Sequence, residues 1–353
     1  MTTTTTAGRH TRRGRIVRAL AALLTGSAVL AACGGGGATS EDGRQKVTFL
    51  NILPLESLSY SAEMIADTKG FFAARGLDVT FEATQGSAPA IQTVLAGSAL
   101  ITRVGDIETM IAAGKRGAPL VNVGEVIHRG TIRMISTKQK PVTRAADFRG
   151  KLVGTPSEGG TSSITLDLVA GSAGIKPDEV RRQVVGLSPG VFDLLKAGRV
   201  DSYIVSLDTA VLLQQTNPDA VVYDPNDDIS AGAQLYATSA AQAQDPQKQD
   251  QLRRYLAAIS DAVAFISEDK KNGYAETMRL ISSKYQVPSL GNPAVAKASL
   301  DGYVASYNAG DAPIGTSPQR WDAAYKEVSG IGLVDPGMDP SRWVDNRFAP
   351  ANP

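Results

Sequence analysis

Apolar runs alternate with helical periodicities along much of the chain. Strand-like apolar runs occupy residues 47–53, 78–83, 100–104 and 121–127. Between the first two runs, Tyr60, Met64 and Phe72 recur at the spacing of a helix face. Two later helical segments are expected to end at Gly97 and Gly114. This alternation predicts right-handed crossovers and a mainly parallel sheet.

The same alternation returns after residue 130. Strand and helix patterns follow one another at 151–154, 162–173, 183–186, 191–197 and 203–206. From Pro246 onward the pattern is helical, with an apolar face made of Leu252, Tyr255, Leu256, Ile259 and Val263. We therefore predict an α/β fold with two lobes, each a mainly parallel sheet flanked by helices. The helical tail is expected to pack on the first lobe.

The N-terminal segment has the layout of an export signal. Arginines in residues 9–18 precede a largely apolar run at 19–30, which is too short to cross about 30 Å of hydrocarbon. The run leads into Leu-Ala-Ala-Cys, which ends at Cys33 and resembles a bacterial lipoprotein box. The resemblance implies that residues 1–32 are a signal peptide and that Cys33 is lipidated. Residues 33–45 are then a flexible tether.

Charge and composition exclude several classes of function. Lys+Arg number 36 and Asp+Glu 35, a net charge of +1, so we predict no nucleic-acid partner. With one cysteine and two histidines, His10 and His128, the chain has no internal disulfide and no multi-cysteine metal site. We expect no metal and no cofactor. The sequence also lacks a pair of histidines at metal-binding spacing, and we predict that the protein is not an enzyme.

Five phrases occur in a fixed order between Tyr60 and Gln214. They are KGFFAARGLDV at 69–79, AGSA at 96–99, GAPL at 117–120, DFRGKLVG at 147–154 and LKAGRVD at 195–201. In this order they resemble ABC-transporter solute-binding lipoproteins of the nitrate/sulfonate/taurine and thiamine-precursor type. One departure is Leu100, which stands where that family often has an aspartate.

The resemblance implies a hinged, two-lobe fold like that of type II periplasmic binding proteins. Lobe 1 is expected to comprise residues 46–129 and 231–353, and lobe 2 residues 130–230, with the chain crossing twice between them. The implied partners are a small-molecule ligand, an ABC permease and its ATPase. We expect a monomer attached by its lipid to the extracytoplasmic face of the cell membrane.

Candidate ligand-binding residues follow the predicted strands, because ligands of open α/β sheets bind beyond the carboxyl ends of the strands. In the first lobe the candidates are Glu56, Ser57, Tyr60, Gln85, Gly86, Ser87, Arg103 and Asp106. In the second lobe they are Ser157, Glu158, Gly160, Thr161, Ser162, Ser206 and Asp208.

Each candidate has a structural alternative. Arg103 is suited to a carboxylate or sulfonate, and equally to a salt bridge with Asp106 or Glu108. The small residues of 157–162 lead into a helix whose free N–H groups favour anions, but Thr161 or Ser162 would also serve as a helix cap. Tyr60 suits either stacking on a ligand ring or the core.

These candidates favour an organic anion, such as a sulfonate or an aromatic carboxylate, as the ligand. The nearest alternative is a thiamine-type pyrimidine precursor, for which Glu56, Glu158 and Tyr60 would bind an aminopyrimidine. Two further alternatives stay open for the whole protein. One is a sensor or receptor that keeps the cleft without transport, and the other is an enzyme on the same fold.

Overall fold

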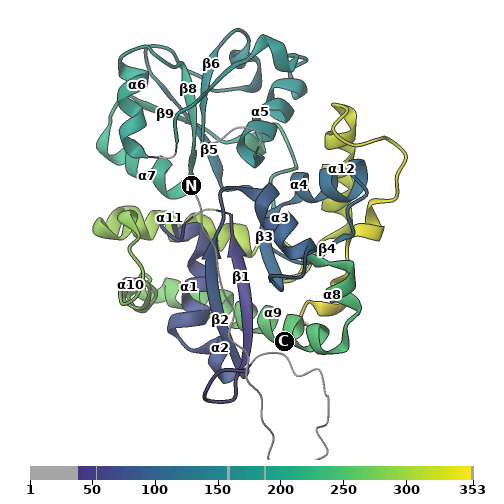
Figure 1. The fold of residues 1–353 in the computed structure, drawn as a ribbon. Coiled ribbons are helices and arrows are strands. Elements are labelled where there is room, and N and C mark those ends of the chain that lie inside the picture. Colours follow the sequence, from purple (N-terminus) through teal and green to yellow (C-terminus); the bar gives the residue numbers. More distant parts are fainter. Residues whose placement is uncertain (1–38, 53, 157–159, 187, 351–353) are drawn as a thin grey trace, which may run out of the picture. The chain divides into compact units, whose positions relative to one another are not determined.

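Two five-stranded sheets form the centre of the structure, which is a computed structural model (Figure 1). Both sheets belong to the same compact unit of the chain. The structure describes residues 39–52, 54–156, 160–186 and 188–350. The predicted signal peptide at 1–32, the lipidation site Cys33 and the candidates Ser157 and Glu158 lie outside these ranges.

The first sheet has the order β2-β1-β3-β10-β4. Its strands are β1 (Gln45–Asn51), β2 (Leu77–Ala83), β3 (Ile101–Gly105), β4 (Leu120–Ile127) and β10 (Gln234–Ser239). Strand β1 pairs in parallel with β2 and β3, and Phe49 lies opposite both Phe81 and Ile101. Strand β10 arrives from much later in the chain and runs antiparallel to β3 and β4. Apart from β10, the strands point the same way, as predicted.

The second sheet has the order β7-β6-β8-β5-β9. Its strands are β5 (Ile132–Thr137), β6 (Leu152–Thr155), β7 (Arg181–Val184), β8 (Ser202–Ser206) and β9 (Ala220–Tyr223). Strand β6 is parallel to β7 and β8, while β5 runs antiparallel to β8 and β9. The two sheets therefore share one plan, four strands in one direction and one reversed. The predicted α/β fold of two lobes is confirmed, and we call the first sheet with its helices lobe 1 and the second lobe 2.

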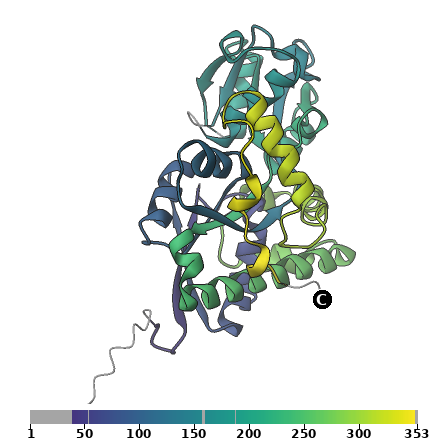
Figure 2. The same cartoon turned by 90° about the vertical axis from the view of Figure 1, so that its right-hand side faces the viewer.

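Helices connect the strands and flank both sheets (Figure 1). Those of the first half are α1 (Ser61–Thr68), α2 (Phe71–Ala74), α3 (Ser87–Leu95) and α4 (Asp106–Met110). Those between the strands of the second sheet are α5 (Thr161–Ser172), α6 (Phe192–Lys196) and α7 (Leu207–Thr216). The tail forms α8 (Ala240–Gln244), α9 (Pro246–Asp269), α10 (Ala275–Ser282), α11 (Pro293–Tyr307) and α12 (Pro318–Gly330). Figure 2 brings α12 and the C-terminal segments, coloured yellow, to the front.

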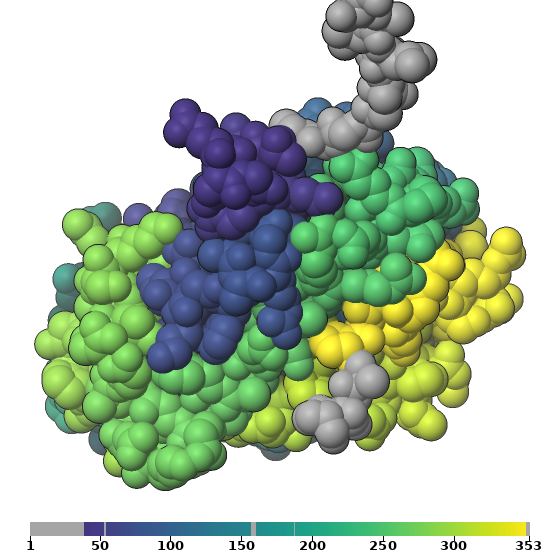
Figure 3. Space-filling model, turned by 90° about the horizontal axis from the view of Figure 1, so that it is seen from below, coloured from purple at the N-terminus to yellow at the C-terminus, as the bar shows by residue number. Residues whose placement is uncertain are grey.

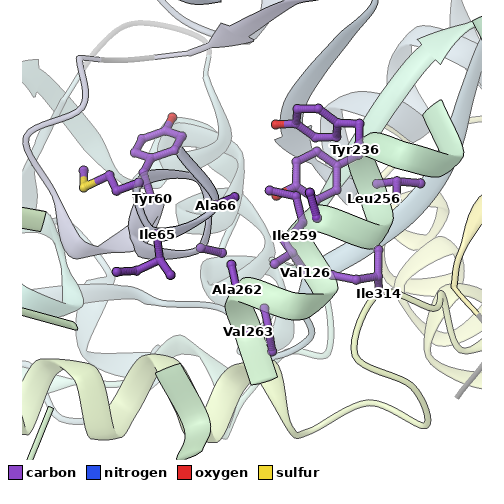
Figure 4. Packing of buried hydrophobic residues seen from close by; sticks show 14 of the residues in the cluster. Tyr60, Ile65, Ala66, Val126, Tyr236, Leu256, Ile259, Ala262, Val263 and Ile314 are labelled. Atoms are coloured by element: carbon purple, nitrogen blue, oxygen red, sulfur yellow. The ribbon is translucent and has the colours of Figure 1, made fainter. Parts of the chain in front are cut away.

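Helix α9 covers one face of the first sheet. Its Leu256 and Ile259 lie beside Tyr236 of β10, and Ala262 faces Ile65 of α1 (Figure 4). The ring of Tyr255 stacks on Phe49 and on Phe72, with centroids 5.7 and 5.0 Å apart. Each such buried side chain contributes about 1.5–3 kcal/mol to stability. Seen from below, these green helices flank the purple and blue N-terminal elements (Figure 3).

The chain passes between the sheets through two neighbouring segments, one after Ile127 and one before Gln234. They touch where the side-chain amide of Asn226 donates to the carbonyl of Gly130 at 2.8 Å. A Cβ on Gly130 would lie 3.2 Å from the carbonyl oxygen of Gly232, so the close approach requires a residue without a side chain. The two crossings therefore form one paired connection between the lobes.

Candidate functional site

A cavity of about 400 Å³ lies between the two sheets. Both lobes, the first crossing at Thr131 and the helical tail contribute to its wall. The lining residues are Ile52, Pro54, Glu56, Ser57, Ser59, Tyr60, Thr131, Ile132, Thr161, Ser162, Ser188, Pro189, Ile204, Val205, Ser206, Asp208, Thr209, Leu212, Gln234, Pro288 and Ser289. The volume falls within the range of small-molecule sites, and mixed apolar and hydroxyl groups are typical of such sites.

The lobe 1 wall begins where β1 ends. The chain leaves the sheet and forms a short 3₁₀ turn, Leu58–Tyr60. The hydroxyl of Ser57 caps this turn by accepting from the N–H of Ser59 at 3.1 Å. The cap holds Ser57, Ser59 and Tyr60 together at the carboxyl end of the central strand, where open α/β sheets bind ligands.

The lobe 2 wall begins at two helix starts. Ser206 ends β8 and is the N-cap residue of α7, and Asp208 lies in the first turn of that helix. Gly160 is the N-cap residue of α5, so Thr161 and Ser162 form its first turn. Two strand-to-helix junctions therefore place their hydroxyl and carboxylate groups on the cavity.

Asp208 joins lobe 2 to lobe 1 at the edge of the cavity. Its carboxylate is 4% exposed and accepts from three hydroxyl groups of lobe 1 and the tail. Ser57 and Tyr303 each donate to Oδ1 at 3.1 Å, and Ser289 donates to Oδ2 at 3.4 Å. Burial, together with the neighbouring Asp208 carboxylate, raises the pKa of Tyr303 well above its ordinary value, which keeps this phenol a donor.

Glu108 makes a second connection between the lobes. Its Oε1 accepts from Ser87 of lobe 1 at 2.9 Å and from Thr161 at the start of α5 in lobe 2. Its Oε2 is buried and has no hydrogen-bond partner among the described residues. The first turn of α5 therefore already faces a carboxylate.

Arg103 lies behind the cavity wall in a buried ion pair. Its Nη1 is 3.0 Å from both carboxylate oxygens of Glu63, and its Nη2 donates to the hydroxyl of Ser59 at 2.7 Å. The side chains of Arg103 and Glu63 are 1% and 0% exposed. Burial lowers the pKa of Arg103, but the Glu63 carboxylate together with the neighbouring Tyr60, Tyr236 and Tyr307 outweighs burial and raises the pKa above the ordinary value. The guanidinium charge is therefore paired inside the protein and does not face the ligand.

The described residues contain no group of three or more His, Cys, Asp or Glu side chains placed to hold a metal ion. Within the same ranges, no helix combines the length and apolarity needed to span a bilayer.

A family model described as NMT1/THI5 like matches residues 59–272, more than half of the chain. The protein belongs to the NMT1/THI5-like family. The match covers the lobe 2 wall of the cavity and part of the lobe 1 wall, from Ser59 onward, whereas Ile52, Pro54, Glu56 and Ser57 precede it. No curated protein sequence matches this NMT1/THI5-like chain.

Solved structures share the fold of this NMT1/THI5-like protein. The alkanesulfonate-binding protein SsuA from Xanthomonas axonopodis pv. citri, bound to MOPS, has a TM-score of 0.65 at 15% identity, covering 85% of this chain and 98% of that one. The periplasmic nitrate-binding protein NrtA from Synechocystis PCC 6803 has a TM-score of 0.63 at 15% identity, covering 86% and 87%. The desulfurization enzyme DSZB also matches, with a TM-score of 0.55 at 18% identity, covering 86% and 97%. The fold is therefore shared by binding proteins and an enzyme.

The structure brings many of the predicted site residues of this family member to one place. Those that line the cavity are Glu56, Ser57, Tyr60, Thr161, Ser162, Ser206 and Asp208. Two others, Ser157 and Glu158, lie outside the described residues.

The other predicted site residues do not line the cavity. Gln85 is exposed, and Gly86 donates its N–H to the carbonyl of Ile52 and precedes α3. Ser87 is bonded to Glu108, and Gly160 serves as the cap of α5. These residues position the elements of the wall.

Arg103 and Asp106 differ most from the prediction. Arg103 was expected to pair with Asp106 or Glu108 if it did not bind ligand, but its partner is Glu63 on α1. Asp106 was expected to bind ligand, but it is fully buried as the first residue of α4, whose N-cap is Gly105. Its carboxylate binds Arg320 of α12 and the N–H groups of Gly232 and Ala233. The sequence indicated the strand ends, but the residues that pair with Arg103 and Asp106 lie in distant segments of the chain.

Several lining residues were not predicted from the sequence. They include Thr131 of the first crossing, Ile132 and Gln234 at the adjoining ends of β5 and β10, Ser188 and Pro189 at the start of a 3₁₀ turn, and the tail residues Pro288 and Ser289. The lobe boundaries were expected at 129/130 and 230/231, so that expectation carried a signal for Thr131, Ile132 and Gln234. The tail residues have no such signal in the sequence, because only the packing of α11 and its preceding turn brings them to the cavity.

Proposed function

We propose that this protein is the extracytoplasmic solute-binding component of an ABC importer. In this proposal it captures a small organic molecule in the cavity between its lobes and presents it to a permease with its ATPase. The observation that carries the proposal is the cavity itself, whose wall takes residues from both sheets and from the first crossing. A ligand bound there contacts both lobes at once and favours their closed arrangement, which is how hinged binding proteins signal occupancy.

The comparisons support a binding role. SsuA and NrtA, which share the fold over most of this chain, are named as alkanesulfonate- and nitrate-binding proteins. The expectation of an organic anion rested on Arg103 and on the helix start at Thr161, but Arg103 is held by Glu63 behind the wall and Thr161 donates to Glu108. The proposal therefore keeps a small organic ligand and drops the anion.

The proposal includes attachment to the membrane through a lipid on Cys33. It rests on the arginine-rich, apolar leader and on the Leu-Ala-Ala-Cys sequence that ends at Cys33. Two or more acyl chains give lasting attachment, where one alone binds reversibly. We propose that the protein acts there as a monomer.

The lining favours binding over catalysis. Hydroxyl groups such as those of Ser206 and Thr209 need a neighbouring base to act as nucleophiles, and these two bond to each other at 3.1 Å. The described lining residues include no histidine, lysine or cysteine that would serve as that base. DSZB carries an activity on the same fold, so catalysis by this chain remains an outcome that the experiment below must distinguish.

A thermal-shift screen tests the proposal. The protein for the screen begins at residue 38, since the compact unit that holds both sheets begins next to it. Sulfonates, carboxylates, amines, pyrimidines and neutral alcohols are added singly and recovered afterwards by mass spectrometry. A ligand at about 100 times its Kd should add roughly 2.7 kcal/mol to the free energy of unfolding. Binding with unchanged recovery supports the proposal. A bound compound that is recovered as a product would indicate an enzyme, and no response across all classes would contradict ligand capture.

A further inference from the structure

The wall of the cavity carries negative charge and no positive charge. Glu56 and Asp208 are its acidic residues, and the described lining includes no Lys, Arg or His. By sequence, the positions between 39 and 350 that the structure leaves undescribed, 53, 157–159 and 187, also hold none of these three residue types. An anion in this cavity would therefore face two carboxylates without a basic side chain to pair with.

We propose that the ligand is a small organic cation, with a protonated amine or amidine that faces Asp208 and Glu56 and an apolar body held by the hydrophobic wall. This inference rests on the proposed function and specifies the class of its ligand. Charge pairing is required because a buried ion without a partner is strongly disfavoured.

Asp208 has the geometry of a cation acceptor. Its Oδ1 accepts from Ser57 and Tyr303, but Oδ2 has one long contact, 3.4 Å from the hydroxyl of Ser289. A carboxylate oxygen accepts two hydrogen bonds, so Oδ2 of this lining residue keeps acceptor capacity. The three hydroxyl contacts fix the carboxylate in place before the ligand arrives, which reduces the entropy lost on binding.

Glu56 lies across the same cavity from lobe 1. Its side chain is exposed, and within the described residues it makes no hydrogen bond or ion pair. A carboxylate with water as its partner exchanges that water for an ammonium group at low cost. Glu56 therefore strengthens binding moderately and helps attract the cation, while Asp208 provides the buried contact.

The two helix starts that would otherwise attract an anion already face carboxylates. Asp208 occupies the first turn of α7, and Glu108 accepts from Thr161 in the first turn of α5. Negative charge at a helix start satisfies the positive end of the helix dipole. The guanidinium of Arg103, behind the wall, is likewise paired with Glu63 at 3.0 Å. The described residues of the lining therefore offer no basic side chain to an anionic ligand.

Between its hydroxyl groups, the wall has apolar side chains that suit an apolar body. Ile132, Ile204 and Leu212 lie on it together with Pro54, Pro189 and Pro288. These groups bind hydrocarbon, whereas an extended polar ligand such as a sugar would leave its hydroxyls facing them. The cavity therefore selects molecules with one charged end and one apolar end.

Matched compounds that differ only in charge test this inference. The compounds are built on benzyl, phenethyl and cyclohexylmethyl bodies, each carrying an ammonium, an alcohol or a sulfonate group. Affinity for the protein from residue 38 is measured by calorimetry at pH 7.5. We expect the ammonium compound of at least one body to bind ten times or more tightly than its sulfonate. A sulfonate that binds as tightly as its ammonium partner, or ammonium compounds that all fail to bind, would overturn the inference.

Charge-removing variants assign the effect to the cavity. Glu56→Gln should weaken the best ammonium ligand about fivefold and leave its alcohol partner unchanged. Asp208→Asn should weaken the same ligand at least tenfold. The matched control is Glu82→Gln, which removes the same charge from an exposed position on β2 away from the lining and should change neither affinity. Equal losses in Glu56→Gln and Glu82→Gln would contradict a local contact.

The outcomes separate this inference from the proposed function. A sulfonate or an alcohol that binds as tightly as the matched ammonium compound leaves the solute-binding function standing and contradicts a cationic ligand. Failure of every compound here and in the broader screen contradicts both.

Discussion

Arg320 donates from Nη1 to Oδ2 of Asp106 at 3.0 Å and so ties α12 to the start of α4. Its Nη2 donates to Glu125, which in turn contacts Nδ1 of His128 at 3.0 Å. Asp106 also accepts from the N–H groups of Gly232 and Ala233. A single guanidinium thus links two buried carboxylates that hold the two crossings, one at His128 and one at Gly232.

Removing this guanidinium should destabilise the protein strongly. Arg320→Met leaves Asp106 and Glu125, both fully buried, without their cation. Breaking a buried ion pair by deleting one partner costs about 3–5 kcal/mol. Urea unfolding at pH 7 measures the loss. The control is Lys326→Met, an exposed residue on the same helix, which should change the free energy of unfolding by no more than about 0.5 kcal/mol. Similar effects of the two variants would show that the link is not structural.

Asp106 should also make stability depend on pH. Burial, only partly offset by Arg320, raises the pKa of Asp106 to about 6. The folded protein therefore binds more protons at this site than the unfolded chain between about pH 4 and pH 6. It follows that the contribution of Asp106 to stability falls as the pH rises through this window and is constant above it.

Comparison with Asp106→Asn isolates this contribution. The free energy of unfolding of the wild type minus that of the variant should fall by up to about 3 kcal/mol between pH 4 and pH 7, from about 1.4 kcal/mol per pKa unit. Urea titrations at four pH values provide the measurement. Glu125, His128 and Arg320 are present in both proteins, so their titration largely cancels. A difference that stays constant with pH would contradict the raised pKa.

Arg103 should act in stability and not in ligand contact. Arg103→Met leaves the buried Glu63 carboxylate without its cation and should lower the free energy of unfolding by about 3–5 kcal/mol. Adding Glu63→Gln to this variant should restore part of the loss, because the stranded charge is then removed. Ligand affinity should change less than about threefold, provided the temperature keeps the variant folded. A hundredfold loss of affinity without loss of stability would indicate that Arg103 contacts the ligand.

Lipidation of Cys33 should determine whether the protein is attached to the membrane. Cys33→Ser removes the thiol that the lipoprotein box would acylate, and we expect the protein to leave the membrane fraction. Fractionation of cells labelled with a palmitate analogue measures both location and lipid. Alanine at Ser40, which leaves the box intact, serves as the control. Membrane association of Cys33→Ser equal to that of the wild type would contradict lipid anchoring through this residue.

The sequence predicted helices and strands that have a clear hydrophobic period. It did not predict which strands or side chains become neighbours, because only the tertiary fold brings them together. The apolar run at 47–53 and the helix from Pro246 appear as β1 and α9 because their patterns match the buried faces that they present. Strand β10 has no local signal for its antiparallel insertion between β3 and β4. Hydrophobic pattern fixes which face is buried, whereas neighbours in a sheet depend on the whole chain.

The same distinction explains the candidate site. Ser57 and Asp208 were both found because each follows a strand, although their contact spans 151 positions of sequence. Arg103 also follows that rule, since it lies near the end of β3. Its partner Glu63 is on α1, 40 positions away, and nothing in either local sequence pairs them. Whether a charge at a strand end faces the cavity or the interior depends on the helix packed against it.

The most direct test of solute capture between the lobes is calorimetric titration of the best ligand into a protein whose cavity has been filled. Leu212→Trp enlarges a half-buried side chain of the wall on α7, and Gln214→Trp places the same group at an exposed position of that helix. We predict that Leu212→Trp lowers affinity at least a hundredfold while Gln214→Trp binds like the wild type, with similar melting temperatures for both. Equal affinity of the two variants would contradict binding in this cavity.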